Sequence, residues 1–154
     1  MEMLPTKILL AADGSRDSGL ALGMATGLAG RTGAELHVVY VALISPWVLS
    51  SNVSDTEYRQ LRQEQQGFLD GLVAQVEAAG GTVAEAHFRV GHRADEEIIR
   101  LSEVLGVDLV VIGSKGQRTI ERALMGSDSE SVVRYSRCPV LVVREGGRSV
   151  LQRG

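Results

Sequence analysis

The chain has 154 residues, which is the length of one domain, and its formal net charge at pH 7 is −3. That charge gives no general attraction for nucleic acid or an anionic membrane, so neither is expected as a partner. Its one cysteine excludes an internal disulfide, and no stretch reaches the roughly 18 apolar residues of a membrane-spanning helix. The apolar start is interrupted too soon by Asp13 and Gly14 to be a signal peptide, so we expect a cytoplasmic protein.

Five short apolar segments predict the strands of a buried sheet. Each is rich in valine, isoleucine, leucine or alanine, as expected for strands that are covered on both faces. In chain order they are residues 7–12, 35–42, 82–90, 108–113 and 139–143. The third alternates more than the others, which is typical of a strand near an edge.

Helices are predicted between these segments, at residues 17–32, 55–79, 94–105 and 126–136. Ser54 and Glu57 have the spacing of a capping box at the start of the second helix. The side chains spaced to face the core are Leu20, Met24 and Leu28, then Tyr58, Leu61, Phe68, Leu72 and Val76, then Ile98, Leu101 and Leu105. Alternating strands and helices predict a mostly parallel sheet, in one domain with its core at about 7–144 and a flexible tail at 145–154.

A glycine-rich segment after the fourth strand carries the strongest chemical signal. Gly113 and Gly116 flank Ser114-Lys115, and after nine more residues Gly126 and Ser127 open a helix. Glycines let backbone N–H groups approach an anion, and a helix N-terminus adds further donors, so this segment predicts a phosphate site. From the residues alone, the same sequence is equally compatible with a turn followed by a capped helix that binds no phosphate. The pattern is neither a Walker loop nor the GxGxxG fingerprint of dinucleotide-binding folds.

The wider pattern resembles the universal stress protein family. Its nucleotide-binding branch has the spacing found here at Gly113, Gly116, Gly126 and Ser127. The segments Asp13-Gly14-Ser15, GHRADEEII at 91–99 and CPVLVV at 138–143 also resemble the family, so the likeness covers about residues 7–144. It implies a three-layer α/β fold of the Rossmann-like, adenine nucleotide α-hydrolase type, with a five-stranded parallel sheet in the order 3-2-1-4-5.

The resemblance also implies a ligand and its site. The ligand is ATP, or AMP or ADP, with Mg²⁺ left open, and the protein is a stress-response regulatory module. The implied binding residues are Asp13 near the adenine and ribose, Val41 at the adenine, Gly113 beside the ribose, and Gly116, Gly126, Ser127 and Ser129 at the phosphates. A homodimer along the last strand, Val140 to Val143, is implied as well. No catalytic residue can be assigned.

Several alternatives stay open at the level of the sequence. Asp13 also fits an ordinary Asp-Gly-Ser turn. Asp128 departs from the family pattern: it can point to solvent, which we favour, hold Mg²⁺ with the phosphates, or weaken ATP binding relative to AMP. Rival functions are a nucleotide-free dimeric interaction module and a slow ATPase. His37 and His87 stand apart from any cysteine or acidic partner at ligand spacing, so we expect them to be sheet residues and expect no metal site.

Overall fold

The computed structural model describes residues 3–45, 54–115, 126–146 and 151. Within them, the strands form one five-stranded sheet in the order β3-β2-β1-β4-β5, and every pairing is parallel. The strands are β1 (Lys7–Ala11), β2 (Glu35–Leu43), β3 (Glu85–Gly91), β4 (Leu109–Gly113) and β5 (Val140–Val143). The helices are α1 (Arg16–Thr32), α2 (Asp55–Ala78), α3 (Ala94–Leu105) and α4 (Ser127–Tyr135). The predicted fold and strand order are therefore confirmed.

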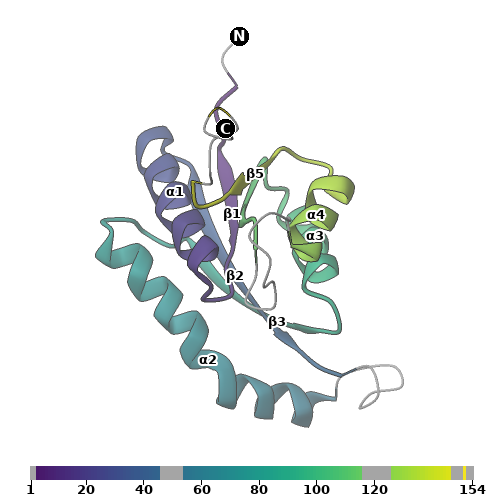
Figure 1. The fold of residues 1–154 in the computed structure, drawn as a ribbon. Coiled ribbons are helices and arrows are strands. Elements are labelled where there is room, and N and C mark those ends of the chain that lie inside the picture. Colours follow the sequence, from purple (N-terminus) through teal and green to yellow (C-terminus); the bar gives the residue numbers. More distant parts are fainter. Residues whose placement is uncertain (1–2, 46–53, 116–125, 147–150, 152–154) are drawn as a thin grey trace.

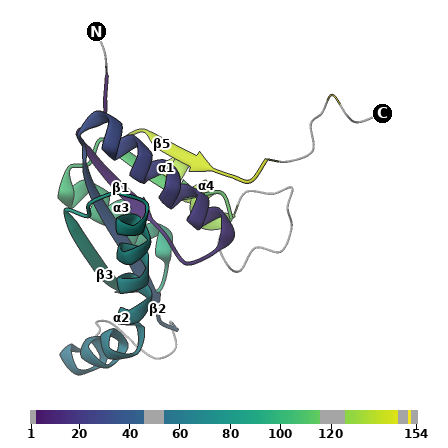
Figure 2. The same ribbon diagram turned by 90° about the vertical axis from the view of Figure 1, so that its left-hand side faces the viewer.

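The helices divide between the two faces of the sheet. Figure 1 shows α1 and α2 on one face and α3 and α4 on the other, and Figure 2 shows α1 lying along the sheet. Strand residues that alternate along β1 consequently enter different cores. Ile8 and Leu10 pack with the α1–α2 side, whereas Leu9 and Ala11 pack with the α3–α4 side. Three layers with two apolar cores result, and β1 lies in the middle of both.

Helix α1 does not bury the residues that its spacing predicted. Leu20 and Met24 are 42% and 46% exposed, whereas Ala21 and Ala25 are fully buried. The prediction was wrong because the face of α1 that packs on the sheet is the neighbouring one, which carries Ala21, Leu22 and Ala25. Leu28 is half-buried and packs at the edge of the core.

Helix α2 follows its prediction more closely. Its capping box between Ser54 and Glu57 is confirmed, and Leu72 and Val76 are buried as expected. Phe68 is 61% exposed, while its neighbour Leu69 is buried instead. The ring of Phe68 still stacks on Tyr40 at 5.6 Å between centroids.

Two further expectations concern the limits of the elements and the membrane. Strand β3 starts at Glu85 rather than at 82, because its pairing with β2 begins where Glu85 faces His37. The described helices include none with both the length and the apolar character needed to cross a bilayer. Most of the expected tail, 147–150 and 152–154, lies outside the described residues.

Candidate functional site

A cleft of about 540 Å³ opens at the carboxyl edge of the sheet. In a parallel sheet, the helix that follows each strand begins at that edge, so its N-terminus points toward the same space. The starts of α1, α3 and α4 all contribute lining residues, as do the ends of β1, β2 and β4. This volume lies within the range of small-molecule sites.

The structure brings the sequence-predicted residues together at this cleft. Those that line it are Asp13, Val41, Gly113, Gly126, Ser127 and Ser129. Gly116 lies outside the described residues. Residues from three separated parts of the chain thus converge on one space, which is the arrangement that a binding site requires.

The turn between β1 and α1 is held by its own polar groups. The Ser15 amide donates to a carboxylate oxygen of Asp13 at 2.9 Å, and Gly14 has the left-handed φ of 83° that this turn needs. The hydroxyl of Ser15 caps α1 by accepting from the Ser18 amide. It also donates to the Lys115 carbonyl at 3.2 Å, which ties the turn to the segment after β4. Asp13 is therefore both a turn residue and a wall of the cleft.

The end of β4 packs directly against the start of α1. A Cβ on Gly113 would stand 2.7 Å from the backbone of Asp17 and Ser18, so only glycine permits this approach. The next residue, Ser114, donates its hydroxyl to the buried Asp17 carboxylate at 2.6 Å. Packing alone accounts for glycine at 113, whatever the ligand is.

Gly126 is the N-cap of helix α4 and provides no side-chain cap. The Gly126 amide donates to the Ser114 carbonyl at 2.6 Å, and the buried Ser129 hydroxyl donates to the same carbonyl at 2.7 Å. These bonds fix the start of α4 against the end of β4. The first N–H groups of a helix have no acceptor inside it, so this end offers donors and a positive dipole to the cleft. Ser129 thus positions the helix with its hydroxyl.

Asp128 connects α4 to α3. The residue is exposed, but its carboxylate does not simply point to solvent as we favoured: it lines the cleft and accepts a hydrogen bond from the Asp95 amide in the first turn of α3. The bond has a counterpart, because Ser131 on α4 hydrogen-bonds to the Asp95 carboxylate. Partial burial raises the pKa of Asp128, and the nearby Asp95 charge raises it further.

Asp95 and Arg93 form the buried part of this corner. Asp95 is 2% exposed and accepts two hydrogen bonds from the Arg93 guanidinium, at 2.7 and 3.1 Å. Burial opposes the ionisation of Asp95, but bonds from Ser131 and Arg93 outweigh it and hold the pKa of its carboxyl below the ordinary value. Asp95 was not among the candidate site residues predicted from the sequence.

Other lining residues were also missed from the sequence. Tyr40 on β2 donates its hydroxyl to Gln65 on α2 at 2.8 Å, and both line the cleft. Burial raises the pKa of Tyr40, and the Asp13 charge adds to this. Their distance of 25 positions in the sequence gave no signal, because only the packing of α2 on β2 brings them together. Among the described lining residues the cations are Arg93 and Lys115.

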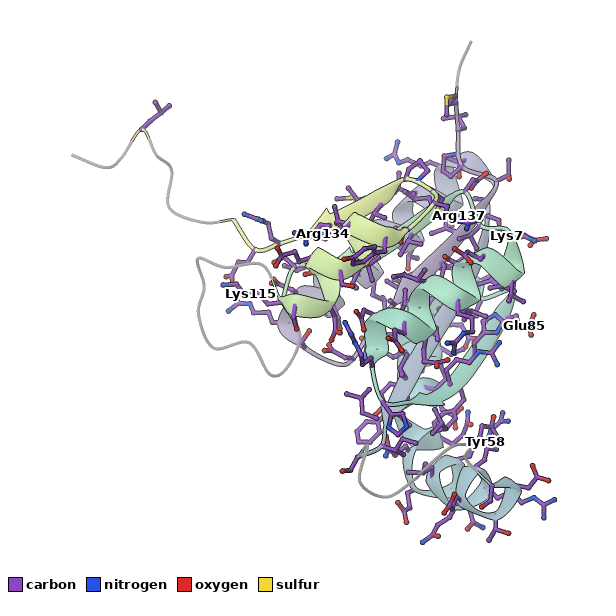
Figure 3. The ribbon with its side chains drawn as sticks, turned by 90° about the vertical axis from the view of Figure 1, so that its right-hand side faces the viewer. Lys7, Tyr58, Glu85, Lys115, Arg134 and Arg137 are labelled. Carbon is purple, nitrogen blue, oxygen red and sulfur yellow. The ribbon has the colours of Figure 1, made fainter. Side chains whose placement is uncertain are left out.

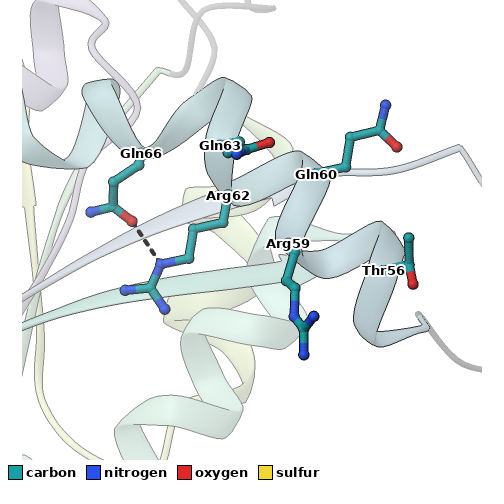
Figure 4. A pocket seen from close by; sticks show the side chains of 6 residues that line it. All are labelled: Thr56, Arg59, Gln60, Arg62, Gln63 and Gln66. Atoms are coloured by element: carbon teal, nitrogen blue, oxygen red, sulfur yellow. Dashed lines mark hydrogen bonds between the residues drawn. The ribbon is translucent and has the colours of Figure 1, made fainter.

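A second depression lies along α2 and is about 680 Å³ in volume. Figure 4 shows its lining side chains, which are Thr56, Arg59, Gln60, Arg62, Gln63 and Gln66. All of them come from one helix, and Arg62 is already bonded to Gln66 at 2.8 Å. Among the described residues, α2 alone lines this depression, so it lacks the groups converging from several elements that mark a binding site.

The structure confirms His37 and His87 as buried sheet residues, but it does not confirm their separation from acidic groups. His37 and His87 are buried and their rings lie together, with Nδ1 of His37 3.0 Å from Nε2 of His87. Acidic partners are near as well: Glu35 lies 3.3 Å from His37, and Glu85 lies 3.8 Å from His87. The sequence did not reveal this cluster because parallel pairing makes neighbours of residues of β2 and β3 that are about 50 positions apart. Glu35 and Glu85 each lie two positions from a histidine on their own strand, and therefore on the same face of the sheet. Burial lowers the pKa of His87, against the opposing effect of Glu85.

Comparison with known proteins agrees with the class that fold and cleft define. The family model described as the universal stress protein family matches residues 5–144. A putative universal stress protein of Staphylococcus haemolyticus is 35% identical over 140 residues, which is 89% of this chain and 83% of that protein. The chain belongs to the universal stress protein family.

Two solved structures extend the comparison to the fold. The hypothetical protein MJ0577 has a TM-score of 0.76 and 28% identity, covering 95% of this chain and all of that one. A universal stress protein solved in complex with cAMP has a TM-score of 0.70 and 24% identity, covering 94% of this chain and all of that one. At 24% identity, the similarity to the cAMP complex shows a shared fold.

Proposed function

We propose that the cleft binds an adenine nucleotide, with ATP as the preferred ligand, and that the protein is a cytoplasmic regulatory module of the stress response. The observation that carries the proposal is the uncapped start of α4, held at the end of β4 by Gly126 and Ser129. Such a helix end is an anion site. A structural neighbour solved in complex with cAMP supports the proposal that the bound anion is the phosphate of an adenine nucleotide.

Each part of a nucleotide has a counterpart in the cleft. The phosphates lie at the first turn of α4, where the N–H groups of Ser127 and its neighbours face the space. Asp13, at the end of β1, accepts from ribose hydroxyls or the adenine amino group. Val41 and Ile98 give apolar contact for the flat base. The cleft volume of about 540 Å³ suits one nucleotide.

The charge balance makes a cation part of the proposal. Asp13 and Asp128 both line the cleft and are close enough for the Asp13 charge to raise the pKa of Asp128. A triphosphate between them is repelled unless positive charge intervenes. Lys115 supplies some of it, and Mg²⁺ coordinated by the phosphates supplies the rest. ATP binding should therefore depend on Mg²⁺ more than AMP binding does.

Calorimetric titration of nucleotide-stripped protein with ATP, ADP and AMP, with and without Mg²⁺, tests the proposal. The variant Ser127→Asp places a negative charge on an exposed position in the first turn of α4, where it does not harm the helix. We expect it to weaken ATP binding by about tenfold or more. The matched control is Thr56→Asp, which adds the same charge to the first turn of α2, away from the cleft.

Equal ATP affinity in wild type and Ser127→Asp would place the phosphates elsewhere. No binding of any nucleotide by the wild type would contradict the proposal and favour the nucleotide-free interaction module. Release of phosphate from ATP, reduced in Ser127→Asp but not in Thr56→Asp, would favour the slow ATPase.

We propose that the protein forms a homodimer through β5. This strand is at the edge of the sheet, and Val140 to Val143 are only half-buried. Nearby on α4, Val133 and Tyr135 are 46% and 63% exposed. Sedimentation of the wild type and of Val142→Lys should give a dimer and a monomer respectively. A wild type that is monomeric at micromolar concentration would contradict the dimer.

A further inference from the structure

A second polar cluster lies on the sheet, separate from the cleft. Its members are His37 and Glu35 on β2 and His87 and Glu85 on β3. They share the face covered by α3, because alternate residues of both strands point the same way and Val39 belongs to the α3 core. One nitrogen of each histidine and one carboxylate oxygen of Glu85 lie within 4.8 Å of one another.

The distances within the cluster fit a bound metal ion. Nδ1 of His37 and Nε2 of His87 are 3.0 Å apart. Two imidazoles on one tetrahedral Zn²⁺, each about 2.0–2.1 Å from the metal, bring their nitrogens to roughly 3.3 Å. The two rings therefore need only a small separation to admit the ion. Without a metal, one ring donates a hydrogen bond to the other.

The outer nitrogen of His37 faces a carboxylate that is not needed as a ligand. Nε2 of His37 is 3.3 Å from Glu35. A metal-bound histidine usually donates its second N–H to a carboxylate, which fixes the ring and makes it a better ligand. His37 and His87 are only 5% and 7% exposed, so the sheet and α3 already restrict their rings.

The two carboxylates have the freedom that a third ligand needs. The side chains of Glu35 and Glu85 are 59% and 62% exposed, so either can turn toward the ion without unpacking the core. Glu85 is the better placed, because one of its carboxylate oxygens already lies within 4.8 Å of a nitrogen of each histidine. Lys7 lies 3.9 Å from Glu35, which compensates that carboxylate and leaves Glu85 as the anionic ligand.

We propose that His37, His87 and Glu85 form a site for one divalent transition metal ion, and that Zn²⁺ fits this donor set best. Two imidazoles and a carboxylate are typical ligands of zinc, whereas Mg²⁺ and Ca²⁺ take oxygen. Water completes the coordination from the exposed side. Arg89, whose charge acts on His87, and Lys7 are the nearby cations, and Glu35 and Glu85 outweigh them locally.

The site is independent of the nucleotide. His37 and Val41 are four residues apart on β2, which is roughly 13 Å along a strand. Figure 3 shows Glu85 on one side of the fold and Lys115, at the segment after β4, on the other. A metal at His37 and His87 therefore does not touch phosphates bound at α4.

Metal binding to the chelator-treated, nucleotide-free full chain tests the site. Zn²⁺ is titrated by calorimetry, and Co²⁺ is added as a probe because four-coordinate Co²⁺ absorbs strongly in the visible. We expect one ion per chain in the wild type and in the control His92→Gln, which changes a histidine outside the cluster. His37→Gln and His87→Gln should lose binding by at least a hundredfold, and Glu85→Gln should lose about tenfold or more.

Glu85→Gln guards against misfolding of the buried variants, because its side chain is exposed and its loss leaves the core intact. Zn²⁺ should also raise the thermal midpoint of the wild type and leave that of His87→Gln unchanged. The proposal is overturned if the wild type binds Zn²⁺ no more tightly than His87→Gln, or if His92→Gln loses binding equally. All titrations omit nucleotide, so failure of the nucleotide proposal has no bearing on them.

Discussion

Close packing between β4 and α1 requires glycine at position 113. Gly113 ends β4, and the backbone of α1 crosses directly over it. The first atoms that an added Cβ would meet are the Asp17 carbonyl carbon and the Ser18 nitrogen, both at 2.7 Å, and these are main-chain atoms that cannot rotate away. In Gly113→Ala, either α1 or β4 must move.

The size of the effect follows from this clash. Forcing one extra carbon into a packed interface costs about 1–3 kcal/mol of unfolding free energy. A domain of this size loses about 2–4 °C in midpoint for each kcal/mol, so Gly113→Ala should melt about 2–12 °C lower. Thermal unfolding followed by circular dichroism, without nucleotide, measures the change.

The control is a glycine-to-alanine substitution at a position where the added Cβ has no neighbouring atom. Gly23 lies within α1 and has no atom within 4 Å of an added Cβ. Alanine is favoured over glycine inside a helix by about 0.5–1 kcal/mol, so Gly23→Ala should melt higher than the wild type. If Gly113→Ala is as stable as the wild type, the close approach of α1 to β4 is incorrect, and glycine at 113 serves a ligand alone.

Three further predictions concern polar groups. Ser114→Ala leaves the buried Asp17 carboxylate without its 2.6 Å donor and should cost about 1–3 kcal/mol of unfolding free energy; an unchanged denaturation midpoint would contradict this. For Asp108, burial opposes ionisation, but bonds from Thr6 and Lys7 hold the pKa of its carboxyl below the ordinary 3.8. The stability that this lowered pKa provides is present above pH 3.8 and is lost as the pH falls through the folded-state pKa. The difference in thermal midpoint between the wild type and Asp108→Asn should therefore shrink in strong acid. Asp128→Asn keeps an acceptor for the Asp95 amide but removes a charge beside the proposed phosphates. The ATP affinity of this variant, measured by calorimetry, should therefore rise by up to about tenfold, and its AMP affinity by less. Equal ATP affinities in the wild type and Asp128→Asn would show that Asp128 does not act on the phosphates.

The sequence predicted the parts of this fold that depend on local pattern. Apolar runs placed the strands, and residues that follow strand ends, such as Asp13 and Gly126, reached the cleft because parallel strands end at one edge. Strand order came from the family resemblance, since periodicity does not specify which strands are neighbours.

What the sequence did not predict depends on contacts between elements. The buried face of α1 was assigned to Leu20, Met24 and Leu28, but packing on the sheet buries Ala21, Leu22 and Ala25 instead. The pairing of Tyr40 with Gln65, and of His37 with His87, needs the register of β2 against its neighbours. For Asp128 the sequence left solvent, Mg²⁺ and phosphate open, and its bond to α3 was not among these.

The place of β1 in the middle of the sheet has a consequence for synthesis. β1 pairs along one edge with β2, which lies within the first third of the chain. Its other edge pairs with β4, where Leu9 lies opposite Val110, about a hundred residues later in the sequence. A growing chain therefore holds the apolar β1 with one row of backbone groups unpaired until β4 leaves the ribosome. Chains truncated before β4 should aggregate or be captured by chaperones, and chains that include β4 should be protected.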